Sequence, residues 1–177
     1  MELEEVVKTR FSCRSFSNKP VPNELLEKII RLSQRAPSAG NLQAFRVIII
    51  KKNEIKTQLA IAALSQTFLA EAPVVLVISA APSLSAPHYG KRGRILYSLQ
   101  DATIFAAYCE MICTDSGLAS IWIGAFSEDQ VVNILRDQVP PVFIEKPIAL
   151  IGIGYPRQKS SHFTRRISMD ELIYSLD

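Results

Sequence analysis

The sequence has few residues of the types that make metal sites or covalent cross-links, with three cysteines and two histidines among 177 residues. Cys13, Cys109 and Cys113 show neither paired zinc-finger spacing nor a CxxC redox spacing, and their odd number disfavours a disulfide scaffold. His88 and His162 lie in polar or proline-adjacent segments, so no histidine cluster can complete a metal site. The sequence therefore predicts no metal, and we expect Cys109 and Cys113 to be buried as small hydrophobic residues.

Charge of one sign and long hydrophobic runs are also scarce. Lys and Arg number 20 against 17 Asp and Glu, a net charge of +3, which is too small a surplus to indicate a nucleic-acid partner. The longest apolar run, residues 72–82, is about half of the ~20 residues that span a bilayer. The acidic start at Met1 lacks the basic and apolar segments of a secretory signal. We therefore expect a cytoplasmic protein without a nucleic-acid or membrane partner.

What the sequence does contain is typical of a folded domain. Apolar residues make up 48% and charged residues 21%, and a chain of this size can bury roughly 70% of its unfolded surface. No repeat or Gly/Ser linker divides residues 1–177, and helical and strand periodicities alternate along them. We therefore expect one α+β domain.

The elements follow from periodicity and from punctuating residues. Apolar, β-branched runs predict strands buried on both faces, and apolar spacings of three and four predict helices, the longest of which should lie centrally. Residues 81–97 contain prolines and glycines without periodicity, so we expect them to form the longest loop. Loops of this length in compact domains are often active-site lids. Ser127 with Gln130 and Ser168 with Glu171 are capping-box patterns that start helices. The expected helices are 3–10, 23–36 and 98–116, and the expected strands 45–50, 74–78, 119–125 and 148–153.

Two basic clusters could bind an anion. Arg10, Ser12 and Arg14 are spaced two apart, so an extended backbone points all three side chains to one side. Guanidinium groups bind phosphate through bidentate charge-assisted hydrogen bonds. The alternative is a solvated basic loop. Arg165 and Arg166 precede the second capping box, and folding could bring them to the same anion.

Two small-residue segments could approach a flat ligand. Residues 36–43 contain Asn41 and Gln43, which offer both donors and acceptors to a heterocycle edge, although an ordinary helix-to-strand connection has the same composition. Gly124 follows a strand and would expose backbone N–H groups, with a simple turn as the alternative. Asp101 is interpreted as a structural cap or buried hydrogen-bond partner. Residues 152–157 lack the third glycine and the following helix of a dinucleotide fingerprint.

Taken in this order, the segments resemble the nitroreductase family of FMN-dependent NAD(P)H oxidoreductases over almost the whole chain. The family's Arg-x-Ser-x-basic-x-Phe pattern is matched by Arg10, Ser12, Arg14 and Phe16. Its Pro-Ser-x-x-Asn-x-Gln pattern is matched by Pro37, Ser38, Asn41 and Gln43, with Ala44 where the family usually has proline. Later matches are Gly90 to Gly93, Tyr97, Gln100-Asp101, Gly117-Leu118, Trp122-Ile123-Gly124 and Gly154-Tyr155-Pro156.

The resemblance implies an α+β fold with a central mixed β-sheet surrounded by helices. It also implies an intertwined homodimer that binds two FMN molecules in its interface. It places the FMN phosphate, ribityl chain and N1/O2 edge of the ring against Arg10, Ser12, Arg14, Arg165 and Arg166. Pro37, Ser38 and Asn41 would come from the other subunit. Gly124 and Ala125 would lie beside flavin N5, and Gln66 would contact the ring.

The implied activity is hydride transfer from NAD(P)H through flavin N5 to a small organic acceptor, such as a nitroaromatic compound, a quinone or a flavin, by a ping-pong mechanism. No protein group is expected to be catalytic itself, because the cofactor supplies the redox chemistry. A non-catalytic flavin-binding protein, a reductive dehalogenase or ring dehydrogenase on the same fold, and a flavin-free anion-binding domain stay open as alternatives.

Overall fold

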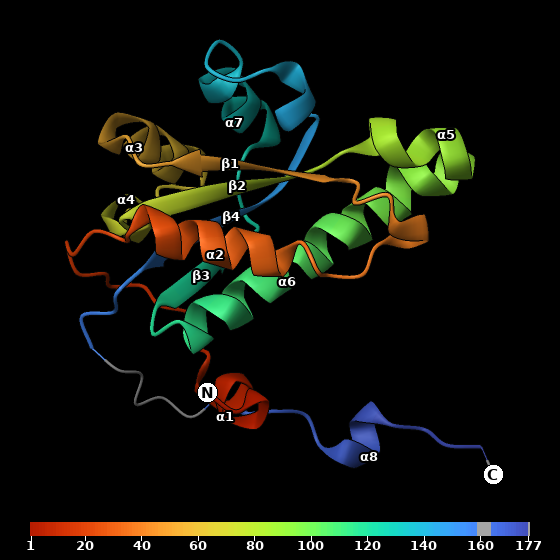
Figure 1. Cartoon of the computed structure of the whole chain (residues 1–177), viewed down its shortest axis with the longest axis horizontal. Helices are drawn as coiled ribbons and strands as arrows, with labels where there is room; N and C mark the ends of the chain where they lie inside the picture. Colours follow the sequence, from red (N-terminus) through yellow and green to blue (C-terminus); the bar gives the residue numbers. More distant parts are fainter. Residues whose placement is uncertain (159–163, 177) are drawn as a thin grey trace.

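A four-stranded sheet forms the centre of the molecule, with helices on both faces (Figure 1). The computed structural model describes residues 1–158 and 164–176, so the expectation for His162 lies outside the described residues. The described elements are α1 (Leu3–Thr9), α2 (Asn23–Ser33), the 3-10 turn η1 (Ala39–Asn41), β1 (Phe45–Ile50), α3 (Asn53–Ala62), α4 (Phe68–Glu71), β2 (Val74–Ala80), α5 (Pro82–Arg92), the π-helix η2 (Gly93–Tyr97), α6 (Ser98–Asp115), β3 (Ala119–Ile123), α7 (Glu128–Leu135), the 3-10 turn η3 (Pro141–Phe143), β4 (Lys146–Gly154) and α8 (Met169–Leu172).

The strands lie in the order β1-β2-β4-β3, and all three pairs are antiparallel. The α+β expectation is confirmed. The expected mixed sheet is not found among the four strands. In the described residues, parallel pairing is limited to one isolated bridge between Ser12 and Ser120, because only the short segment after α1 runs parallel to β3. The N-terminal segment thereby extends the sheet beyond β3.

Alternating side chains of the sheet divide the core into two layers. Val75 and Val77 of β2 pack on the side of α3, α4 and α7, while Leu76 and Ile78 pack on the side of α2 and α6. Every residue of β2 is buried, as the continuous apolar run predicted. β1 departs from that prediction, because it is an edge strand and Ile49 is 46% exposed. The sheet is the middle layer of three.

The long helix α6 is central, as expected, and packs on α2 and on the sheet (Figure 1). Phe105 is fully buried and stacks on Phe45 with ring centroids 4.5 Å apart. Cys109 and Cys113 are also fully buried, which confirms their interpretation as small hydrophobic residues. Gly117, with φ 75°, ends the helix in the left-handed region that glycine adopts without strain.

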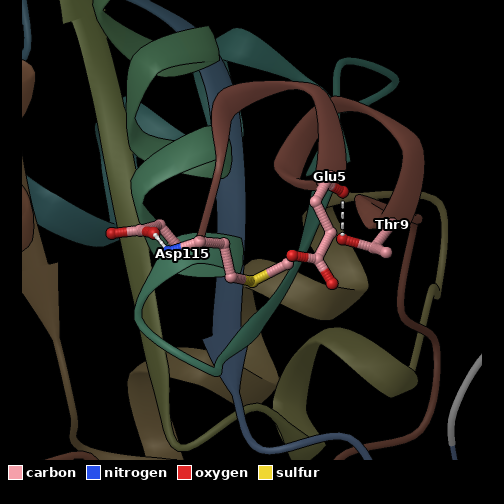
Figure 2. A network of polar contacts seen from close by, with 4 residues as sticks. Glu5, Thr9 and Asp115 are labelled. Carbon is pink, nitrogen blue, oxygen red and sulfur yellow. Dashed lines mark hydrogen bonds and ion pairs between the residues drawn. The ribbon is translucent and has the colours of Figure 1, made fainter.

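The helix α1 is held against the far end of α6. The amino group of Met1 lies 2.6 Å from the Asp115 carboxylate, and Thr9 donates a hydrogen bond to the Glu5 carbonyl (Figure 2). The hydrogen bond and charge of Asp115 raise the pKa of that amino group, and the same contact lowers the pKa of Asp115. This contact fixes the point from which the following basic segment starts.

The expected loop at residues 81–97 is instead helical, so that prediction was wrong. Pro82 occupies the first turn of α5, where a missing N–H costs nothing. The N–H of Ser83 donates to Glu145 Oε2 at 3.0 Å, so a residue distant in the sequence caps the helix. Gly90 then bends the chain with φ 55° and ψ −135°, and η2 leads directly into α6. Long-range capping is invisible to local periodicity, which explains the error.

Asp101 of α6 fastens the segment between α2 and β1, as its interpretation as a buried hydrogen-bond partner predicted. Its carboxylate accepts the N–H of Ala39 at 2.9 Å and the N–H of Ala44 at 3.4 Å. Asp101 is 2% exposed. Ala44 has the N–H that the family's usual proline would lack, so this contact replaces the rigidity of a proline ring.

We predict that Asp101→Ala lowers the free energy of unfolding by about 1–3 kcal/mol, because two backbone N–H groups lose their acceptor. Urea denaturation measures the loss, and amide hydrogen exchange at Ala39 and Ala44 should accelerate. The exposed Asp137→Ala is the control and should change stability by less than about 0.5 kcal/mol. Equal effects of the two substitutions would contradict the anchoring role.

Candidate functional site

The basic segment after α1 lies along the outer edge of β3. Ser12 forms the parallel bridge with Ser120, and the N–H of Cys13 donates to the Ser120 carbonyl at 2.9 Å. Because the backbone is extended, side chains alternate: Cys13 is 2% exposed, whereas Ser12 and Arg14 face solvent. The burial pattern thus supports the predicted common side for Ser12 and Arg14, whereas Arg10 ends α1 and is half-buried.

Arg10 is positioned by a buried carboxylate that the sequence analysis did not single out. Its Nη1 lies 3.7 Å from Glu110 Oε1, and the same oxygen accepts a hydrogen bond from Ser120 Oγ at 3.0 Å. Glu110 is the one acidic residue on the buried face of α6 beyond its first turn. A charged residue within an apolar helical face was the available signal. The guanidinium has five N–H donors, so most of them stay free for a ligand.

Arg14 lies over an aromatic ring. Its guanidinium carbon is 6.0 Å from the centroid of Phe68, at the outer limit of a cation–π contact. Within residues 1–158 and 164–176 no carboxylate lies in ion-pair distance of it. The side chain therefore keeps its full hydrogen-bonding capacity for an anion. Phe68 is a second neighbour that the sequence analysis missed.

Gln66 and Ala125 come together beside this edge. Gln66 Nε2 donates to the carbonyl of Ala63 at 2.9 Å and to that of Ala125 at 3.4 Å. Gly124 and Ala125 directly follow β3 and are exposed. Six of the predicted site residues thus share one region of the molecule: Arg10, Ser12, Arg14, Gln66, Gly124 and Ala125.

Backbone strain marks two loops that carry predicted site residues. Asn41 and Gln43 have φ of 56° and 50°, and Leu64 and Ser65, just before Gln66, have φ of 57° and 58°. In the part of the chain that the structure describes, these are the four non-glycine residues with positive φ. Such conformations cost about 1–3 kcal/mol each and cluster at functional sites.

The residues of the second motif lie near the other end of α6. Asp101 and Glu110 are nine residues apart on one helix, which is about 13 Å along its axis. A cavity of about 580 Å³ adjoins the Asp101 end, and its lining includes Pro37 and Ser38 together with Tyr97, Gln100, Asp101 and Ile104. Asn41 belongs to the same loop. Pro37, Ser38 and Asn41 therefore do not join the six residues at β3 within one chain.

A larger cavity, of about 720 Å³, lies among α2, α3 and α4 and includes none of the predicted residues. Lys56 lines it and is 4% exposed, with Nζ donating to the Ala72 carbonyl at 2.7 Å. Burial lowers the pKa of this amine. The single hydrogen bond ties α3 to the start of β2, so we interpret Lys56 as a packing contact rather than a site.

Arg165 and Arg166 lie in the exposed segment that precedes α8. Arg166 donates to the carbonyls of Thr164 and Arg165 at 3.2 and 3.3 Å. These hydrogen bonds are local and do not place either arginine beside Arg10 or Arg14. Their convergence on one anion stays a prediction.

The cysteine thiols are not placed as nucleophiles. Burial raises the pKa of Cys109 to about 12, raises that of Cys113 well above its usual value, and also raises that of Cys13. The thiolate is the reactive form, so all three are inert near neutral pH.

In residues 1–158 and 164–176, no three acidic, histidine or cysteine side chains are grouped to hold a metal ion. In the same residues, no helix has the length and apolarity needed to cross a membrane.

Comparison with known proteins places the chain in a family. A sequence profile of the nitroreductase family matches residues 7–67 and 54–155. An NADH dehydrogenase of Thermus thermophilus is 27% identical in an alignment 191 positions long. The alignment covers 93% of this chain and 91% of the relative. An FMN reductase [NAD(P)H] of Bacillus subtilis is 27% identical over 175 residues, which cover 90% of this chain and 69% of the relative.

A solved structure shows the same fold. The NADPH:FMN oxidoreductase of Vibrio harveyi, in complex with NAD+, superposes with a TM-score of 0.86 at 21% sequence identity, over 99% of this chain and 77% of that one. The profile match covers both sequence patterns and the β3 edge. The chain therefore belongs to the nitroreductase family, as its motifs predicted, and the expectation of an oxidoreductase is confirmed with it.

Proposed function

We propose that this protein is an FMN-dependent oxidoreductase that takes a hydride from NAD(P)H and delivers it to a small organic acceptor. The observation that carries the proposal is the grouping of six predicted site residues at the outer edge of β3, where two arginines keep free donors beside an exposed glycine. The names of the Bacillus subtilis and Vibrio harveyi relatives support this cofactor and this donor.

The residues present fit an FMN molecule in charge and in shape. A phosphate monoester is doubly negative, and Arg10 offers the guanidinium donors that such a group requires. Arg14 supplies a second cation for the N1/O2 edge of the ring. Gly124 has no side chain and is exposed, so its backbone is open to a flat ring. A Cβ there would come 3.3 Å from Trp122 Nε1. Gln66 adds an amide at the same edge.

A second copy of the chain would complete the site. Residues 164–176 are exposed throughout, and they include the large apolar side chains Ile167, Met169, Leu172, Ile173, Tyr174 and Leu176, each at least 56% exposed. Thr103, Ala107 and Tyr108 are exposed on α6. Apolar surface of this extent is typical of an interface. We therefore place FMN in a homodimer interface, with Pro37, Ser38 and Asn41 contributed by the partner.

Each residue then has a defined part in the mechanism. When bound, FMN supplies the hydride chemistry at N5. Arg10 and Ser12 hold the phosphate, with Arg10 fixed from behind by Glu110. Arg14 favours additional negative charge at the N1/O2 edge of the ring. Exposed backbone at Gly124 and Ala125 orients the ring, and NAD(P)H and the acceptor bind in turn at the same face.

The visible spectrum of the purified protein tests cofactor and activity together. We expect flavin absorption that disappears when NADH or NADPH is mixed with the protein under argon and returns on addition of an acceptor. A yellow protein that neither nucleotide bleaches would be a non-catalytic flavin carrier. A colourless protein that does not take up added FMN would overturn the proposal.

Arg14→Ala should lower both turnover and the midpoint potential of bound FMN, because the charge that favours electron uptake is lost. A loss of about 1.4 kcal/mol corresponds to ~30 mV for a two-electron couple. Spectroelectrochemical titration measures the shift, and Arg136→Ala, at an exposed arginine directly after α7, is the control. An unchanged potential with full activity would remove Arg14 from this role.

Cys13→Ser should leave turnover within about twofold of wild type, since burial keeps this thiol protonated. Serine can keep the hydrogen bond that Cys13 Sγ donates to the Ser15 carbonyl at 3.2 Å. Steady-state kinetics on the FMN-loaded variant measures this. Complete loss of activity with FMN still bound would show that a protein thiol takes part in the reaction.

A further inference from the structure

The net charge of the protein is concentrated in one segment. Residues 82–97 contain Lys91, Arg92 and Arg94 and no acidic residue, whereas the rest of the chain contains 17 basic and 17 acidic residues. The whole surplus of +3 therefore belongs to α5 and η2. A local surplus of this kind attracts anions even when the protein as a whole is nearly neutral.

The fold holds these cations at a fixed place. Gly90 takes φ 55° and ψ −135°, a conformation open to glycine, and turns the chain just before Lys91. Gly93 packs so closely that a Cβ would lie 2.4 Å from the Ser85 carbonyl oxygen. The basic residues continue into the π-helix η2, a type of turn that often accompanies functional sites.

The same segment packs on the loop that carries Ser38 and Asn41. The Tyr89 ring meets the Tyr97 ring edge-on at 5.1 Å, and a Cβ on Gly40 would lie 2.4 Å from the Tyr89 hydroxyl. Tyr97 lines the cavity of about 580 Å³ together with Pro37 and Ser38. The basic segment thus forms one side of the second half of the proposed cofactor site.

Arg92 links the charges to that cavity. Its Nε donates to the Tyr97 hydroxyl at 3.0 Å, and its guanidinium carbon lies 5.2 Å from the Tyr97 ring centroid. Lys91 and Arg94 are exposed, and none of the three has a carboxylate at ion-pair distance in the described residues. Arg92 contacts a residue that lines the cavity, and Lys91 and Arg94 lie within two residues of Arg92 in the sequence. Together the three cations form an anion-binding surface.

We propose that Lys91, Arg92 and Arg94 bind the 2′-phosphate of NADPH and make this nucleotide the preferred hydride donor. The inference rests on the proposed function, because it assigns the donor that uses the same site. A phosphate monoester offers three acceptor oxygens and close to two negative charges, which match these side chains. NADH carries a neutral 2′-hydroxyl at that position and gains nothing from them.

The paired substitution Lys91→Gln, Arg94→Gln tests the proposal and leaves Arg92 and its contact with Tyr97 intact. We expect kcat/KM for NADPH to fall at least tenfold, through a higher KM, while kcat/KM for NADH changes less than twofold. Raising the salt concentration should reduce the NADPH preference of the wild type, since exposed charges are screened. Lys52→Gln, Arg136→Gln removes the same charge from exposed positions on other elements and should alter neither nucleotide.

A binding measurement separates this inference from the proposed function. Calorimetry with 2′,5′-ADP and with 5′-AMP reports the phosphate contact without turnover, and the wild type should bind 2′,5′-ADP at least tenfold more tightly than the Lys91→Gln, Arg94→Gln variant does. Equal affinities of wild type and variant for 2′,5′-ADP, a parallel fall for both nucleotides, or a wild type that prefers NADH would overturn the inference. A wild type that binds 2′,5′-ADP but oxidises neither nucleotide would overturn the proposed function instead.

Discussion

Two buried carboxylates on α6 hold the two segments on which the proposed cofactor site depends. Asp101 accepts the N–H of Ala39, at the start of η1, and that of Ala44, which follows η1. Glu110 accepts a hydrogen bond from Ser120 and faces Arg10. A buried carboxylate is unfavourable unless it is paired, so each segment is drawn to a fixed point on the helix. The nine-residue separation of the two acids along α6 therefore sets the distance between the two halves of the site.

Local periodicity was sufficient to predict the type of those helices and strands that bury a continuous apolar surface. The run in β2 and the spacing in α6 gave the right element types, since these segments are buried by their own composition. Residues 82–97 resisted the same reasoning because their helical state depends on Glu145 and on the close contact of Gly93 with Ser85. Those contacts join residues far apart in sequence or require a Cβ-free position, and periodicity reports neither.

The candidate site, too, has a part that the sequence predicted and a part that only the structure shows. Alternation along an extended backbone predicted that Ser12 and Arg14 share a side, and the burial of Cys13 between them agrees. The neighbours that fix these arginines, Glu110 and Phe68, come from α6 and α4. Packing already accounts for Phe68 in its helix. The charge of Glu110 on an apolar helical face indicates a buried partner, but only the folded chain shows that the partners are Arg10 and Ser120.

The order of these groups along α6 favours a symmetric assembly over a single-chain site. When a two-fold axis lies perpendicular to a helix, the helix and its copy run antiparallel, and the start of one faces the end of the other. The Asp101 end of one α6 would then meet the Glu110 end of its partner, which brings the Ser38 loop of one subunit to the Arg10 segment of the other. Symmetry repeats the arrangement, so one interface yields two equivalent sites. The basic residues Lys91, Arg92 and Arg94 follow Gly90 in the segment that packs on the Ser38 loop. In each subunit they would therefore act at the site to which that subunit contributes its Ser38 loop.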